Sequence, residues 1–500
     1  MTSRVPLLIA TLPGHTLAEL RADQVAAVRA GADLAEVRID RLPAAERASM
    51  ADLFPSPLPL LATYRSRTEG GQGDDDPVAR GVVLGAAAGL PFAAIDLEAA
   101  RDAALVGHLP GEGRRTVLLS AHLPVEVALD DLLDRLAHPL PPRTVSKVVF
   151  PCSIGRWLSE IRPHLKDRNA ADLVLMATGP AGPLSRAWAR RSGLFAVFGA
   201  IPSSVAEPSL RPPVEASQLP IDRMRTFFEA GEGAPLVGLA GRPVAHSRSP
   251  DLYARFQDGT GRAGLYLLLE FADDREFVSA LPGLAAGGFR GLNVTHPFKD
   301  AALVAASRVD RAAEICGVAN CLSFDGDRIE AQNTDLAAIL RRLGELRRSG
   351  RWNGRALAVV GAGGAARATL AAARELGAVS TVFARRPEAA SDLARAFGAT
   401  VGDPESCAAA SLLVHATPAG RAGSPPLALP LDRLVDADTH VLDWVYAPED
   451  RALPALAHEA RASYEDGWRM LVYQAAASFG VWWDQEPSPE AVDAAVEAHP

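Results

Sequence analysis

Two lysines of this chain stand out as residues that could act as a nucleophile or an acid/base. Lysine and arginine together number 51 among the 500 residues, yet only Lys147, Lys166 and Lys299 are lysines. A lysine shielded from water can lose its proton near neutral pH and act as a nucleophile or an acid/base, whereas arginine stays charged. Lys147 stands in the apolar run 143–150 and Lys299 follows Asn-Val-Thr-His-Pro-Phe, while Lys166 is expected at a solvated helix end. We therefore expect Lys147 and Lys299 to be functional.

The first 200 residues predict the elements that would position Lys147. Short β-type runs alternate with helical sequence, which is typical of a (β/α)8 TIM barrel with its active site at the carboxyl ends of the strands. Polar residues stand at those ends: Glu36 and Arg38, Arg65, Glu98 and His122, with Lys147 inside the sixth run. The eight expected strands are 6–12, 34–40, 58–65, 93–98, 116–122, 144–150, 172–178 and 194–200.

This set of side chains favours Schiff-base chemistry. A lysine on an inward strand among valines would attack a ketone, and His122 would then move protons. Arg38, Arg65 and Arg186 offer cationic forks for a carboxylate or hydroxyls. The alternative is a buried Lys-Glu ion pair that only fills the barrel.

The same residues carry a family resemblance. The segments 36–40 (Glu-Val-Arg-Ile-Asp), 63–71, 120–122 and 185–186 make this half resemble a type I 3-dehydroquinate dehydratase. Two departures stand out: Leu123-Pro124 follows His122, and Val214 replaces a serine of the substrate loop. The run from Glu69 to Asp76 is expected to be part of a lid or a surface loop. The resemblance assigns function to Glu36, Arg38, Arg65, Glu69, His122, Lys147, Arg186 and Gln218.

A second α/β system follows a proline-rich segment and begins at Leu236. The strand-like run 356–360 leads into the glycine turn Gly361, Ala362, Gly363, Gly364 and Ala365, which opens a helix. Such a turn can bind a pyrophosphate at the helix N-terminus. The next strand ends in Ala384, Arg385 and Arg386 and lacks the acidic residue that binds a ribose 2′-hydroxyl, which favours NADP(H) over NAD. The alternative is two solvated arginines.

The second half resembles the shikimate dehydrogenases over about residues 235–485. The motifs are 241–250 (Gly-Arg-Pro-Val-Ala-His-Ser-Arg-Ser-Pro), 293–299 and 333–335. The resemblance implies a proton-transferring pair, Lys299 and Asp335. Departures are Cys321, Leu336, His415 and Arg421. The implied substrate-binding residues are Ser247, Ser249, Thr295, Asn320, Tyr446 and Gln474, and further cofactor contacts are Thr417 and Gly467.

Together these observations predict four segments in one chain. They are a TIM barrel (1–225), a linker (226–234), a shikimate-binding lobe (235–348 and 465–490) and a Rossmann-like NADP-binding lobe (349–464). The expected function is bifunctional: dehydration of 3-dehydroquinate to 3-dehydroshikimate, then NADPH-dependent reduction to shikimate. Three alternatives stay open: quinate as the dehydrogenase substrate, a degenerate barrel fused to a quinate/shikimate dehydrogenase, and a binding protein without catalysis.

Composition narrows the partners. The net charge of −9 argues against non-specific nucleic-acid or membrane-surface binding. The four cysteines show no metal-ligand spacing, so we expect no metal and a reducing compartment. No signal peptide or membrane span is evident, which favours the cytoplasm. The sequence leaves open whether the protein is a monomer or a dimer.

Overall fold

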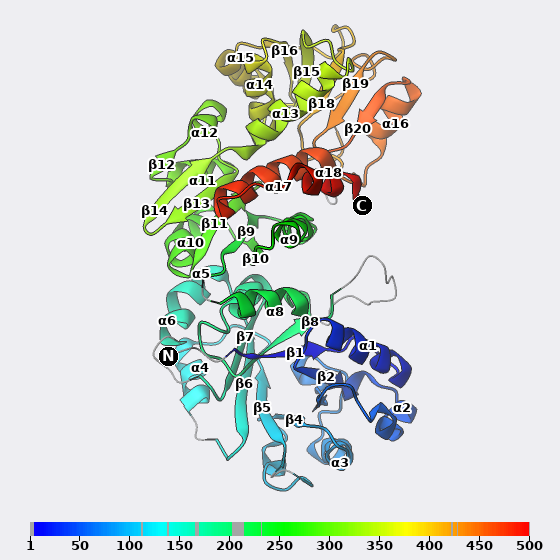
Figure 1. The fold of residues 1–500 in the computed structure, drawn as a ribbon, viewed down its shortest axis with the longest axis vertical. Helices are drawn as coiled ribbons and strands as arrows, with labels where there is room; N and C mark the ends of the chain where they lie inside the picture. Colours follow the sequence, from blue (N-terminus) through cyan, green and yellow to red (C-terminus); the bar gives the residue numbers. More distant parts are fainter. Residues whose placement is uncertain are drawn as a thin grey trace. The chain divides into compact units, whose positions relative to one another are not determined.

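The computed structural model describes residues 5–111, 114–137, 140–165, 170–202, 215–231, 233–421, 424–427 and 429–499. The predictions for Lys166 and Val214 lie outside these residues. The chain divides into two compact units, residues 1–234 with 263–284 and residues 235–262 with 285–500. Figure 1 shows the elements of both.

The first unit contains the predicted barrel. Its strands are β1 (Leu7–Thr11), β2 (Leu34–Arg38), β3 (Leu60–Thr63), β4 (Ala94–Glu98), β5 (Thr116–His122), β6 (Thr144–Pro151), β7 (Leu173–Thr178) and β8 (Ala196–Ala200). They form one sheet in the order β7-β6-β5-β4-β3-β2-β1-β8. The Phe195 N–H donates to the Leu173 carbonyl over 2.8 Å, where β7 meets the start of β8. The prediction of eight strands in a barrel is confirmed.

Helices connect most of these strands. They are α1 (Leu17–Arg29), α2 (Ala44–Ala48), α3 (Pro77–Ala88), α4 (Leu129–Ala137), α5 (Ile154–Arg156), α6 (Arg162–Leu165), α7 (Gly182–Ala187) and α8 (Ile221–Ala230). The sequence determines where α1 begins, because Thr16 and Glu19 form a capping box that satisfies free backbone N–H groups at the start of the helix. After β4 the described residues 99–111 form only a 3₁₀ turn, Ala103–Leu105, instead of the expected helical run. Gly107, Pro110 and Gly111 interrupt the sequence there.

Two further sheets follow along the chain. The first has the order β10-β9-β11-β13-β14-β12. The second, β17-β16-β15-β18-β19-β20, is parallel throughout, as expected of a Rossmann-like lobe. The strands are β9 (Leu236–Gly241), β10 (Leu265–Glu270), β11 (Phe289–Val294), β12 (Arg308–Val309), β13 (Cys321–Asp325), β14 (Arg328–Gln332), β15 (Ala356–Val360), β16 (Val379–Phe383), β17 (Thr400–Val401), β18 (Leu412–His415), β19 (His440–Asp443) and β20 (Ser463–Glu465).

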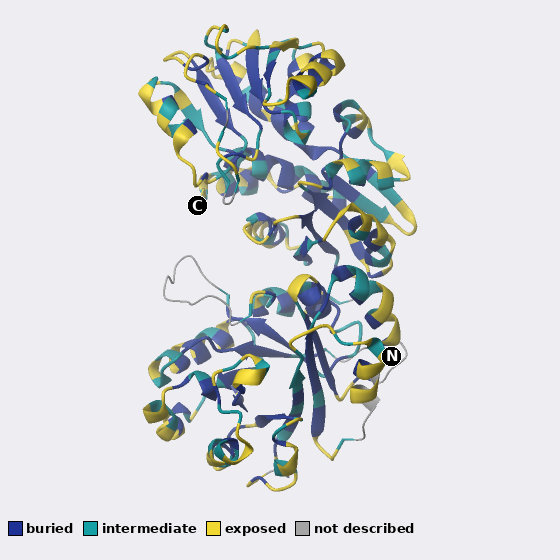
Figure 2. Cartoon of the chain, turned by 180° about the vertical axis from the view of Figure 1, so that it is seen from behind, coloured by how far each residue is buried: buried dark blue, intermediate teal, exposed yellow. Residues whose placement is uncertain are grey.

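The helices of this part cover the sheets, and the strands are the most buried elements (Figure 2). Helix α17 is rich in aromatic residues, and its Trp482 indole N–H donates to the Leu322 carbonyl over 3.0 Å. Helix α17 thereby returns to the sheet that contains β13. The helices are α9 (Ser249–Thr260), α10 (Asp274–Ala286), α11 (Lys299–Ala305), α12 (Arg311–Cys316), α13 (Thr334–Arg348), α14 (Gly364–Glu375), α15 (Pro387–Phe397), α16 (Ala452–Glu459), α17 (Trp468–Trp483) and α18 (Pro489–Glu497).

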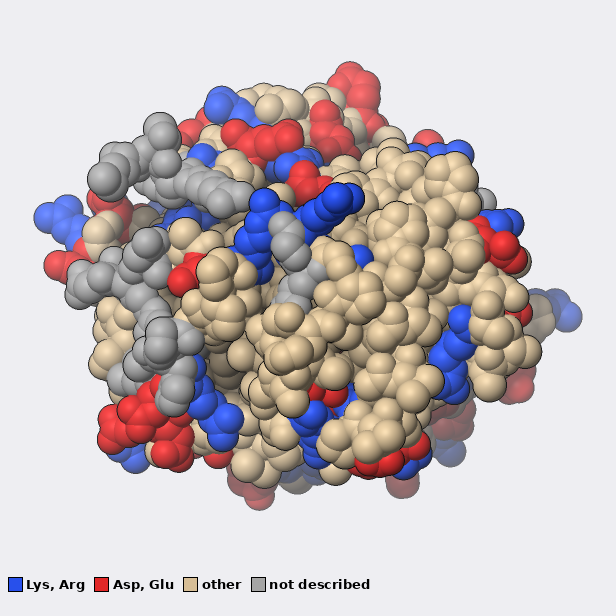
Figure 3. Space-filling view, turned by 90° about the horizontal axis from the view of Figure 1, so that it is seen from below, with Lys and Arg blue, Asp and Glu red and all other residues tan. Residues whose placement is uncertain are grey.

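Nucleic-acid or membrane binding would place requirements on the surface charges and on the helices. On the face shown in Figure 3, both basic and acidic side chains lie among uncharged residues. Within the described ranges, no helix has the length and apolar character needed to cross a membrane.

Candidate active sites

The barrel holds a cavity of about 200 Å³ at the carboxyl ends of its strands. The eight residues to which the family resemblance assigns function all line it: Glu36, Arg38, Arg65, Glu69, His122, Lys147, Arg186 and Gln218. Residues from several strands and the loops that follow them thus meet at one place, as the carboxyl ends of barrel strands require. Thr11, Phe198 and Glu215 are lining residues that the sequence did not indicate.

Lys147 is buried and pairs with an aspartate that the sequence analysis missed. Its Nζ lies 2.8 Å from Asp96 Oδ2 and 3.9 Å from Glu36 Oε1, and 4.0 Å from the centre of the Phe198 ring. The alternative prediction, a buried ion pair between Lys147 and a glutamate, is therefore wrong about the nearest partner, which is Asp96 and not Glu36. Asp96 could have been found, because in β4 it alternates with Glu98 and so faces the same side of the strand.

Arg65 joins the acidic groups around Lys147. Its guanidinium contacts Asp96 (2.9 Å), Glu69 (2.8 Å) and Glu98 (3.3 Å). Burial would raise the pKa of Asp96, but the charges of Arg65 and Lys147 hold it well below its ordinary value. Asp96 is therefore a fixed anion beside the Nζ of Lys147.

His122 is held in its neutral form. Burial, and then the nearby charges of Arg65 and Lys147, lower the pKa of His122 well below 6.5. Glu69 accepts the backbone N–H of His122 at 3.0 Å and lies 3.3 Å from its Nδ1. The run from Glu69 to Asp76 is thus divided, because Glu69 belongs to the cavity whereas Asp76 caps α3. The departure at Leu123 preserves the strand, since its N–H donates to the Val149 carbonyl.

The remaining predicted barrel residues are fixed by neighbours. Glu36 accepts hydroxyl groups from Thr11 and Thr63, each at 2.9 Å. Gln218 donates to the Thr11 hydroxyl oxygen at 3.0 Å, and Arg38 forms a two-point pair with Asp40. These contacts set the orientation of the side chains before any ligand arrives.

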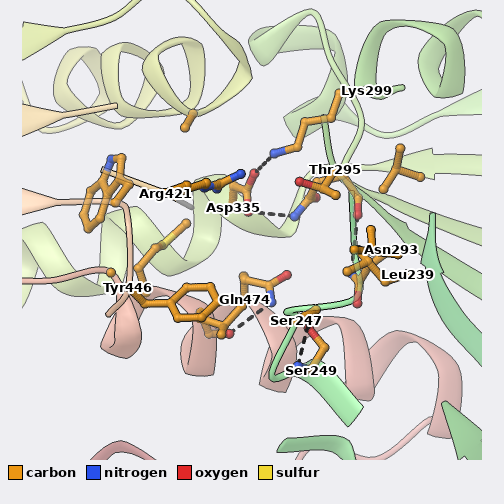
Figure 4. A pocket seen from close by; sticks show the side chains of 18 of the residues that line it. Leu239, Ser247, Ser249, Asn293, Thr295, Lys299, Asp335, Arg421, Tyr446 and Gln474 are labelled. Carbon is orange, nitrogen blue, oxygen red and sulfur yellow. Dashed lines mark hydrogen bonds and ion pairs between the residues drawn. The ribbon is translucent and has the colours of Figure 1, made fainter. Parts of the chain in front are cut away.

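A second cavity, of about 150 Å³, lies in the other unit (Figure 4). It brings together residues from the ends of β9 and β11, the starts of α11 and α13, the loop after β19 and helix α17. Eight residues predicted to be catalytic or substrate-binding line it: Ser247, Ser249, Thr295, Lys299, Asn320, Asp335, Tyr446 and Gln474. The lining also includes Arg421, at a position noted as a departure, and Trp444 and Met470, which the sequence did not indicate.

Lys299 and Asp335 form the predicted pair. The Lys299 ammonium donates to Asp335 Oδ2 at 2.5 Å, and Asn320 donates to the other carboxylate oxygen at 2.8 Å. Asn333 caps α13 by accepting the Leu336 N–H, so Asp335 lies in the first helical turn. Across the cavity the Ser247 hydroxyl donates to Ser249 at 3.1 Å. One wall therefore carries an acid/base pair and the other carries hydroxyl groups (Figure 4).

The predicted cofactor residues lie at the carboxyl edge of the parallel sheet. Gly361 to Ala365 connect β15 to α14, and Ala384, Arg385 and Arg386 follow β16. Gly361 has φ 130°, and a Cβ there would lie 2.7 Å from the Ala416 carbonyl, so only glycine fits. Arg385 and Arg386 are exposed. A tight glycine turn, a helix N-terminus and two exposed guanidinium groups fit a dinucleotide with a 2′-phosphate.

Thr417 and Gly467 have different surroundings. Gly467 precedes α17 and lines the second cavity together with Ala365. Thr417 follows β18, and its hydroxyl contacts His415 Nε2 at 2.5 Å. The other imidazole nitrogen lies 2.8 Å from Asp443, so the departure at His415 is a buried bridge between Asp443 and Thr417.

Both halves of the chain match known protein families. Residues 8–230 match the family model for type I 3-dehydroquinase, and residues 239–322 match that for the shikimate dehydrogenase substrate binding domain. The shikimate dehydrogenase (NADP(+)) of Acidiphilium cryptum is 40% identical over 261 residues, which are 51% of this chain and 92% of that protein. The chain belongs to the shikimate dehydrogenase family, and its first half matches the type I 3-dehydroquinase family.

Two solved structures are also similar to this chain. The shikimate 5-dehydrogenase of Thermus thermophilus in complex with NADP(H) and shikimate is 32% identical, with a TM-score of 0.46 over 53% of this chain and 100% of that one. The dehydroquinate dehydratase and shikimate dehydrogenase of S. pombe AroM is 20% identical, with a TM-score of 0.44 over 99% of each chain. The first cavity lies within the residues that match the type I 3-dehydroquinase model, and the second is lined in part by residues that match the shikimate dehydrogenase substrate binding domain.

Proposed function

We propose that this chain catalyses two consecutive reactions, dehydration of 3-dehydroquinate in the barrel and reduction of the resulting 3-dehydroshikimate in the second unit. The observation that carries the proposal is the assembly of two complete residue sets, each around a cavity of its own. The product of the first reaction is the substrate of the second.

In the barrel, Lys147 passes its ammonium proton to neutral His122, and the free amine adds to the C3 ketone. His122 returns the proton to the carbinolamine hydroxyl, which leaves as water and gives an iminium ion. The iminium withdraws electrons from the neighbouring C–H bond, and neutral His122 removes that proton as a general base. His122 then returns a proton to the departing hydroxyl group, which leaves as water. Addition of one water to the iminium releases the enone and regenerates Lys147.

The other barrel residues position the reacting atoms. Asp96 and Glu36 fix the Lys147 Nζ, and Glu69 holds the strand end that carries His122. Arg186 is buried and cationic and is our candidate for the carboxylate of the substrate.

In the second unit, Ser247 and Ser249 donate to the substrate carboxylate, while Asn320, Asp335 and Lys299 face the ring hydroxyls and the carbonyl. Thr295, Tyr446 and Gln474 complete this wall. The Lys299 ammonium, held 2.5 Å from Asp335, gives a proton to the carbonyl oxygen as it is reduced.

NADPH, when bound, supplies the hydride. The turn from Gly361 to Ala365 would hold its pyrophosphate, and Arg385 and Arg386 its 2′-phosphate. Thr417 and Gly467 would lie on the nicotinamide side. The relatives that carry NADP(+) in their names support this cofactor.

The alternatives have less support. The match of residues 8–230 to a 3-dehydroquinase family gives no support to a degenerate barrel. The two serines at 247 and 249 favour shikimate over quinate as the dehydrogenase product, and comparing kcat/KM for oxidation of the two compounds tests this.

The decisive experiment supplies purified protein with 3-dehydroquinate and follows the ultraviolet absorbance of the enone, then adds NADPH and follows its oxidation. We expect both signals in sequence. Lys147→Arg should abolish enone formation and the borohydride-trapped adduct while leaving NADPH oxidation with 3-dehydroshikimate intact. Enone formation by Lys147→Arg would contradict the imine mechanism.

A further inference from the structure

A carboxylate of the chain itself fills part of the barrel cavity. Glu215 lines the cavity, and its Oε2 lies 3.1 Å from Arg186 Nη2. The Ser217 backbone N–H donates to Glu215 Oε1 at 3.0 Å, and the Ser217 hydroxyl donates to Oε2. A guanidinium group, a backbone N–H and a hydroxyl group are the donors that recognise a carboxylate.

This cradle is rigidly built. Arg186 is 2% exposed. Its Nε donates to the Phe198 carbonyl at 3.1 Å, and its Nη1 donates to the carbonyls of Ala177 and Gly182, both at 3.0 Å. Nη2 is the atom that reaches Glu215, so backbone carbonyls fix the direction in which this end of the guanidinium group donates.

Ser217 is built into the same cradle. Its hydroxyl oxygen accepts from Arg186 Nη1 at 3.1 Å. A Cβ on residue 182 would lie 2.2 Å from this oxygen, so the glycine at 182 makes room for it. Ser217 itself is 8% exposed, which makes its hydroxyl a buried polar group with a defined direction.

We propose that Arg186 and Ser217 form the subsite for the substrate carboxylate and that Glu215 occupies it until the substrate displaces Glu215. This inference rests on the proposed dehydratase function. Ser217 then supplies the hydroxyl group that the sequence lacks at position 214. Two carboxylates repel each other within one cradle, so Glu215 competes with the substrate. Glu215 is 34% exposed and can move toward solvent, whereas Arg186 is enclosed.

The test measures KM and kcat for 3-dehydroquinate in Glu215→Gln. Removal of the competing charge should lower KM about fivefold, the upper range for a partly exposed ion pair, with a much smaller effect on kcat. Glu229→Gln is the matched control, because Glu229 is exposed, pairs only loosely with Arg225 and lies outside the cavity. An unchanged or higher KM in Glu215→Gln would overturn the role of Glu215 as a competitor.

Ser217 is tested in the same background. Adding Ser217→Ala to Glu215→Gln should raise KM about tenfold, because a hydrogen bond to a charged group is lost, whereas Ser159→Ala on the exposed helical segment after β6 should not. An unchanged KM would remove Ser217 from the subsite. Enone formation by the unsubstituted protein separates the two proposals. Enone formation with unaltered KM values in the variants rejects the subsite, whereas no enone from the unsubstituted protein rejects the dehydratase.

Discussion

His122 shows how neighbours of one residue set a measurable property. Burial and the charges of Arg65 and Lys147 lower its pKa well below 6.5. Only the neutral imidazole accepts a proton, and with a lowered pKa the neutral form persists at lower pH. We therefore predict that kcat/KM for dehydration stays level through pH 6.5 and falls only at lower pH.

A pH profile of enone formation checks this. The prediction would be contradicted by an acidic inflection at or above pH 6.5, the ordinary pKa of histidine, if that inflection disappears in His122→Gln. Such a result would show that the pKa of His122 is not lowered in the free enzyme. The dehydrogenase reaction of the same samples, followed with 3-dehydroshikimate, shows whether the chain stays folded across the range.

Substitution of Lys299 or Asp335 should impair the dehydrogenase reaction and spare dehydration, the reverse of the result expected for Lys147→Arg. Lys299→Ala removes the proton donor, so we expect kcat for NADPH oxidation to fall by about 10²–10⁴-fold, while enone formation in the barrel is unchanged. Asp335→Asn keeps the shape and the Asn320 contact but not the charge, and should also lower kcat. Full dehydrogenase activity in Lys299→Ala would exclude this lysine as the proton donor.

Among the elements, we propose that the end of β16 decides the choice between NADPH and NADH. Arg385 and Arg386 are exposed where the strand ends and α15 begins. If they bind the 2′-phosphate, Arg386→Ala should raise KM for NADPH about tenfold, the cost of one charged hydrogen bond, and leave KM for NADH unchanged.

Arg395→Ala is the control for that measurement, because Arg395 lies on α15, is exposed and pairs with Asp392. Equal effects on NADPH and NADH would mean that Arg386 acts on helix α15 and not on the phosphate.

At the scale of the whole molecule, each unit contains all the side chains of its own site. We therefore predict that Lys147→Arg and Lys299→Ala proteins complement each other. Neither alone should convert 3-dehydroquinate to shikimate, whereas an equimolar mixture should oxidise NADPH after a lag while free 3-dehydroshikimate accumulates. A mixture without NADPH oxidation, although each protein retains its own single activity, would show that the intermediate must stay on one chain.

The sequence by itself determined the eight barrel strands, the Rossmann-like strand, turn and helix, and many of the residues that line both cavities. It could do so because successive side chains of a strand point to opposite faces and the carboxyl ends of barrel strands lie together. Glycine turns and rare lysines are also visible in short stretches of sequence. Lys147 and His122 are examples: their strands are visible as apolar runs, and both side chains line the cavity.

Only the tertiary structure decided which groups touch. Lys147 pairs with Asp96, 51 positions away, and His415 bridges Asp443 and Thr417. Glu215 lies on Arg186 although no local pattern joins them. The physical reason is that strand register and burial fix such distances, and these depend on how the whole sheet closes. The prediction of a helix after β4 was wrong for a local reason. Glycine and proline in that segment disfavour a helix, although strands and helices alternate in the neighbouring βα units.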